Sequence, residues 1–85
     1  MLFMVKVTHE YSTCQAHHPT KADLYKTTLA NLSDHGIKVH GHYTNRLEHT
    51  NFIVCETDSF ESLDAAFDPI LEMGHFEATP VMKRE

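Results

Sequence analysis

The chain has 85 residues, of which 41% are hydrophobic and 22% charged, so we expect one small globular domain that spans residues 1–85. Its formal net charge of -5 argues against nucleic acid or an anionic membrane as a partner, because phosphate binding requires a basic surface. Two cysteines are too few for a disulfide scaffold, and no apolar run approaches the roughly 20 residues that cross a membrane. The N-terminus does not resemble a signal peptide, so we expect a cytoplasmic protein with free thiols.

Residues 2–8 form the first predicted strand, because apolar and other side chains alternate along them. The apolar set is Phe3, Val5 and Val7, and the opposite set is Met4, Lys6 and Thr8. The next residues are polar and irregular and predict a loop that contains Cys14, His17 and His18. A thiolate and two imidazoles could bind a soft metal ion, although the more ordinary interpretation is a mobile loop that serves as a lid.

A helix is predicted from Thr20, with Asp23 three residues later in an arrangement similar to a capping box. Gly36 is expected to end this helix. Its inward stripe, at helical spacing, consists of Tyr25, Thr28, Leu29 and Leu32.

The stretch 36–44 is the predicted strand that carries the most chemistry. Alternation places two imidazoles on one face, and residues i and i+2 of a strand are about 6–7 Å apart, which suits two ligands of one metal ion. Ile37, Val39 and Tyr43 are expected on one face, and Lys38, His40, His42 and Thr44 on the other.

A third strand is predicted over residues 51–56 after a polar connection, and a hairpin joins it to the second. Asp58 is expected to cap a second helix that Pro69 bends or shortens and Gly74 ends. The core stripe of this helix is Phe60, Leu63, Phe67 and Leu71. Residues 75–81 form the last predicted strand.

The resulting order, β-α-β-β-α-β, predicts an α+β, ferredoxin-like fold with a four-stranded antiparallel sheet and both helices on one face. The strand over 51–56 leaves its own orientation open, because apolar side chains occupy both of its faces. The face away from the helices is expected to hold Met4, Lys6, Thr8, His40, His42, His75, Glu77 and Thr79.

Four short segments carry a family resemblance: MLFMV at 1–5, GIKV at 36–39 followed by Gly41, VCETD at 54–58 and FEATPV at 76–81. Together they resemble a small family of uncharacterised domains in the dimeric α/β-barrel superfamily. The resemblance implies that two subunits pack sheet on sheet around a cavity. Superfamily members include small monooxygenases, muconolactone-type isomerases, dehydratases and haem-degrading enzymes. The family tends to have Trp then His where this chain has Tyr43 and Thr44, so no active-site residue carries over.

The segment from His40 to His42 is the sharpest candidate metal site. A zinc, copper or nickel ion would need a third or fourth ligand. His75 and Glu77 lie on the same predicted face of the last strand, and in a dimer of the implied kind the partner's His75 or the partner's Glu77 could complete the set. The alternative is two histidines that are hydrogen-bonded in a polar cavity.

The same cavity could support acid–base catalysis by His40, His42, Glu77 and Lys6. Lys6 and Glu77 are predicted on neighbouring strands and on one face, and a histidine near a carboxylate can move protons at neutral pH. The alternative is a cross-strand ion pair between Lys6 and Glu77 that only fills the sheet.

The sequence therefore favours a homodimer that binds a small-molecule ligand in a polar, histidine-rich cavity, and it leaves further assembly open. A metal-binding protein that uses His40 and His42 with His75 or Glu77 is the first alternative. A small isomerase-, dehydratase- or monooxygenase-type enzyme is the second. The sequence does not name a substrate or decide whether a metal cofactor binds.

Overall fold

The computed structural model describes residues 1–9 and 19–84. Its strands are antiparallel and lie in the order β2-β3-β1-β4. The α+β, ferredoxin-like fold that the sequence predicts is therefore confirmed. The elements follow one another as β1 (Leu2–Thr8), α1 (Pro19–Ala30), η2 (Leu32–His35), β2 (Lys38–Asn45), β3 (Thr50–Glu56), α2 (Phe60–Phe67), η3 (Asp68–Met73) and β4 (His75–Val81), where η denotes a 3₁₀ helix.

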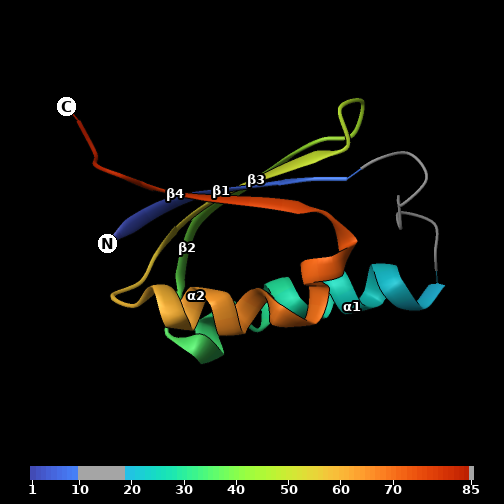
Figure 1. Ribbon diagram of the computed structural model, residues 1–85, viewed down its shortest axis with the longest axis horizontal. Coiled ribbons are helices and arrows are strands. Elements are labelled where there is room, and N and C mark those ends of the chain that lie inside the picture. Colours follow the sequence, from blue (N-terminus) through green and yellow to red (C-terminus); the bar gives the residue numbers. More distant parts are fainter. Residues whose placement is uncertain (10–18, 85) are drawn as a thin grey trace.

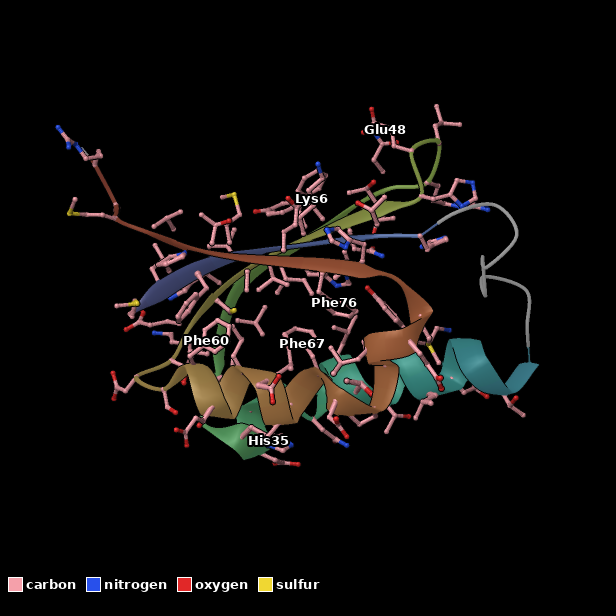
Figure 2. The ribbon with its side chains drawn as sticks, viewed as in Figure 1. Lys6, His35, Glu48, Phe60, Phe67 and Phe76 are labelled. Atoms are coloured by element: carbon pink, nitrogen blue, oxygen red, sulfur yellow. The ribbon has the colours of Figure 1, made fainter. Side chains whose placement is uncertain are left out.

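The molecule has two layers, with both α-helices on one face of the sheet (Figure 1). Figure 2 shows Phe60, Phe67 and Phe76 between the sheet and the helices, whereas Lys6 points away from the helices. Within the described residues, no helix covers the opposite face, which we call the open face. None of the helices in these ranges is both long enough and apolar enough to cross a membrane.

The core lies between the sheet and the helices. In β1 and β3 the buried apolar side chains fall at alternate positions, namely Phe3, Val5, Val7, Ile53 and Cys55. This settles the strand that the sequence left ambiguous, because Phe52 and Val54 point to the open face instead. Burial raises the pKa of the Cys55 thiol, which suits a small core residue rather than a nucleophile.

The predicted stripe packs against the core, with Thr28 of α1 and Leu32 of η2 buried and Tyr25 and Leu29 partly buried. The α-helix ends at Ala30, earlier than predicted, and the 3₁₀ helix η2 continues to Gly36. Gly36 has a φ of 75°, a left-handed conformation that costs glycine little. The Ile37 N–H donates to the Leu32 carbonyl at 3.2 Å and closes this end.

The start of α2 differs from the prediction by one residue. Ser59 rather than Asp58 is the N-cap, and its hydroxyl oxygen accepts a hydrogen bond from the Ser62 N–H at 3.2 Å. The expected burial of Phe60 is wrong, because this residue in the first turn is 58% exposed. Its ring still contacts the edge of the Phe3 ring, with the centroids 6.0 Å apart.

The end of α2 shows the predicted effect of Pro69, since the chain tightens there into the 3₁₀ helix η3. A 3₁₀ helix has three residues per turn instead of 3.6, so the inward positions change. Ile70 becomes fully buried, while Leu71, expected in the core, is 41% exposed. Gly74 follows η3, and a Cβ there would lie 2.9 Å from the Thr8 carbonyl oxygen, so this crossing requires glycine.

Candidate functional site

The open face is defined by the exposed and half-buried residues whose register places them away from the helices. In antiparallel pairs, residues directly opposite each other point to the same side of the sheet. The open-face residues are Leu2, Met4, Lys6 and Thr8 of β1; Lys38, Gly41, Tyr43 and Asn45 of β2; Phe52, Val54 and Glu56 of β3; and His75, Glu77, Thr79 and Val81 of β4.

Three of the predicted site residues come together on this face. Lys6 is directly opposite Glu77, and Thr8 is directly opposite His75. His75 and Glu77 are therefore neighbours on the same face of β4, next to β1. Their predicted placement on one face is confirmed, and their chemical roles stay predictions. Within the described ranges no salt bridge joins Lys6 to Glu77. Although Lys6 and Glu77 lie directly opposite each other, they do not form the cross-strand ion pair that was the alternative prediction.

Strand β2 contains a β-bulge at His40. Val39 lies opposite Cys55, and Gly41 lies opposite Val54, which is adjacent to Cys55 in β3. Two steps along β2 therefore correspond to one step along β3. His40 is thus one extra residue with no partner of its own in the ladder. An extra residue moves every later side chain of the strand to the other face.

The prediction that His40 and His42 share one face is therefore wrong. His42 lies opposite the buried Ile53, on the helix side, although its edge position leaves it exposed. Tyr43, predicted on the core side, lies opposite Phe52 on the open face. The shared face on which the predicted metal site was built is therefore absent, and a metal-binding role for either histidine stays a prediction.

The bulge also explains the glycine that follows it. A Cβ built on Gly41 would lie 2.7 Å from Cε2 of the Tyr43 ring. The aromatic ring therefore fills the space that the missing side chain leaves on the open face. Gly41 makes room for Tyr43 rather than for a helix.

His40 forms an imidazole–carboxylate pair with Glu56, a residue that sequence reasoning did not select. His40 Nε2 lies 2.9 Å from Glu56 Oε1, with the two side chains 38% and 52% exposed. The hydrogen bond to His40 lowers the pKa of Glu56, and nearby positive charges, including Lys38, add to this effect. An imidazole in hydrogen-bond contact with a carboxylate is an arrangement that general acid–base catalysis uses.

The other predicted metal ligands are not assembled into one site. Within the described residues, no group of three or more His, Cys, Asp or Glu side chains is arranged to hold a metal ion. The proposed set of His40, His42 and His75 is divided between two faces and two edge strands. The cluster of Cys14, His17 and His18 lies outside the described residues.

The comparisons with known proteins identify the family. A family model described as a domain of unknown function, DUF3303, matches residues 1–85. The chain belongs to the DUF3303 family. No curated protein matches it. Among solved structures, this DUF3303 chain is similar to the crystal structure of SCO4226 from Streptomyces coelicolor A3(2), with a TM-score of 0.60, 13% identity, and 98% of this chain and 100% of that chain covered.

These matches confirm the predicted resemblance to an uncharacterised small-domain family. The likeness to SCO4226 shows the fold alone at this level of identity. The placement of this DUF3303 chain in the dimeric α/β-barrel superfamily stays a prediction.

The DUF3303 chain also contains a histidine pair that sequence reasoning did not single out. His9 Nε2 and His49 Nδ1 are 3.0 Å apart, and the rings meet edge to face with centroids separated by 4.9 Å. Burial, followed by the neighbouring His49, lowers the pKa of His9. The two residues flank the paired ends of β1 and β3, so a predicted β1–β3 register would have been the signal that finds them.

Proposed function

We propose that this DUF3303 domain acts as a homodimer in which two open faces meet and enclose a site for a small organic molecule. The observation that carries the proposal is the open face, which no helix of the described ranges covers. It exposes 43% of Met4 and 64% of Tyr43, next to the half-buried Phe52 and Val54. Apolar and aromatic side chains gathered on a bare sheet face favour burial against a partner.

The charges of the open face suit contact with a second copy. Lys6 and Lys38 share the face with Glu77 and Glu56, so a two-fold axis can set the ammonium groups of one copy against the carboxylates of the other. The net charge of -5 is therefore no obstacle, because the meeting surface itself carries both signs.

The same residues indicate the chemistry of the ligand. Lys6 lies between Phe52 of β3 and Glu77 of β4, so a cation and a carboxylate adjoin an aromatic ring. Binding sites combine an apolar lining with a few polar groups that fix orientation. The ligand is accordingly a small molecule with an apolar body and a polar or acidic end that reaches Lys6.

The dimer is tested by the mass of the protein in solution. We expect about twice the chain mass of 9.7 kDa for the wild type. Phe52→Glu places a charge in the proposed contact and should give the single-chain mass. The matched control is Leu47→Glu, which adds the same charge at a residue that is 90% exposed in the hairpin turn and should leave the dimer intact. A wild type at the single-chain mass would overturn the proposal.

The cavity is tested with the dye anilinonaphthalene sulfonate, which has apolar rings and an anionic end. Its fluorescence should rise with the wild type, remain unchanged with Phe52→Glu, and rise less with Lys6→Gln. Lys83→Gln, a change at an exposed position beyond β4, serves as the control. Equal fluorescence with all four proteins would contradict a site at the open face.

Acid–base catalysis is a second candidate function, favoured by the 2.9 Å contact between His40 and Glu56. A molecule found to bind should then be converted by the wild type, with the rate reduced about 100-fold or more in His40→Gln. The control His35→Gln changes a histidine of η2, on the far side of the helices (Figure 2). Recovery of the molecule unchanged from the wild type would leave binding as the function.

A further inference from the structure

His9 and His49 form an imidazole pair at the end of the sheet where β1 stops and the β2–β3 hairpin turns. Besides the 3.0 Å contact between ring nitrogens, the His9 N–H donates to the His49 carbonyl at 3.1 Å. Both rings are therefore attached to backbone that the sheet already holds in place, and they are only partly exposed. A fixed backbone lowers the entropic cost of holding two side chains together around a ligand.

The separation of the two nitrogens fits two ligands of one ion. A transition-metal ion lies about 2.0–2.1 Å from each imidazole nitrogen. Two such nitrogens are about 2.9 Å apart when they meet the ion at a right angle and about 3.3 Å apart at the tetrahedral angle. The observed 3.0 Å lies within this range, so an ion placed to one side of the line between the two nitrogens could contact both.

The backbone of His49 supplies an independent observation. His49 has a φ of 51°, and among the described non-glycine residues it is the one with positive φ. Its N–H donates to the Arg46 carbonyl at 3.2 Å in the turn, a position that hairpins usually fill with glycine or asparagine. Holding a non-glycine residue in this backbone conformation costs of order 1 kcal/mol or more, and residues strained in this way are concentrated at functional sites.

We propose that His9 Nε2 and His49 Nδ1 together bind one divalent transition-metal ion, Cu²⁺ or Zn²⁺, with water in the remaining positions. Imidazole nitrogen suits both ions. Because the described residues provide no set of three ligands, binding is expected to be reversible and weaker than at a structural zinc site.

The first test is NMR of the full chain during addition of Cu²⁺, which broadens signals close to the ion. Signals of His9 and His49 should broaden before those of His35 and His42, two exposed histidines elsewhere in the fold. Broadening that starts at His35 or His42, or that affects all four equally, would overturn the proposal.

The second test compares variants in Zn²⁺ calorimetry. His49→Gly removes an imidazole and also relieves the positive φ, so the protein should stay folded while Zn²⁺ affinity falls at least about 10-fold. His9→Gln, which leaves the turn unchanged, should cause the same loss, and the control His35→Gln should cause none. Unchanged affinity in both His9→Gln and His49→Gly would place the ion elsewhere. Neither test depends on the proposed dimer, because both ligands come from one chain.

Discussion

Strands β1 and β2 have similar alternating sequences, but only β1 keeps its alternation in the structure. β1 is paired on both sides, with β3 and β4, so two registers fix the face of each side chain. β2 is an edge strand with one neighbour, and it accommodates an extra residue at His40. A period of two therefore predicts faces well where a strand is held on both sides, and less well at an edge, where one bulge reverses all later positions.

Deleting one residue from each strand should give the largest difference. Deletion of Lys6 would turn Val7 from the core to the open face, so we expect loss of the cooperative unfolding transition. Deletion of His40 removes only the bulged residue and leaves Val39 and Gly41 on their present faces. Loss of the bulged residue should cost about 1 kcal/mol or less.

Urea denaturation followed by circular dichroism would measure both deletions. If removal of His40 unfolded the protein as removal of Lys6 does, the bulge would be essential to the sheet, and the comparison of the two strands would fail.

A smaller difference is expected from two residues that face each other across β2 and β3. Ile53 is 1% exposed, whereas its register partner His42 is exposed at the sheet edge. Ile53→Ala should lower the free energy of unfolding by about 2–4 kcal/mol, because it leaves a cavity in the core. His42→Ala should change it by about 0.5 kcal/mol or less. A loss above about 1 kcal/mol in His42→Ala would show that the helix side of β2 is packed.

The smallest effect concerns the end of β1, where His9 meets His49 of the hairpin. The folded-state pKa of His9 is below the ordinary value of 6.5, so folding favours the neutral ring. Its contribution to stability is therefore complete above about pH 6.5 and is lost as the pH falls through the folded-state pKa. The difference in free energy of unfolding between wild type and His9→Gln should shrink from about pH 7.5 to 5. A difference that grows on acidification would reverse the assigned direction.

Most of the fold could be predicted because its determinants are local. Alternation identified β1 and β4 with the bounds that the structure has, and helical spacing identified the stripe of α1. The error at the end of α2 arises where the helical period changes, since the 3₁₀ geometry of η3 buries Ile70 in place of the expected Leu71. A proline indicates such a break, but the sequence does not predict which residue becomes buried after it.

The candidate site could be predicted only in part. Lys6, His75 and Glu77 were placed correctly because β1 and β4 contain no irregularity in their mutual register. A glycine within a strand is a signal for a bulge, and Gly41 could have warned that the histidines beside it separate. The His9–His49 pair joins residues 40 positions apart, so it depends on strand pairing that no local pattern specifies.

Both borders of the sheet have a feature that hinders the addition of another strand. β2 has its bulge, and β4 contains Pro80, which has no N–H to offer to a neighbouring strand. Unpaired backbone groups along a regular border are a common starting point for aggregation and for strand exchange between molecules. With these two strands at its edges, the sheet is hindered from extending by strand addition into a continuous assembly. Its open face is then the surface where another molecule can bind.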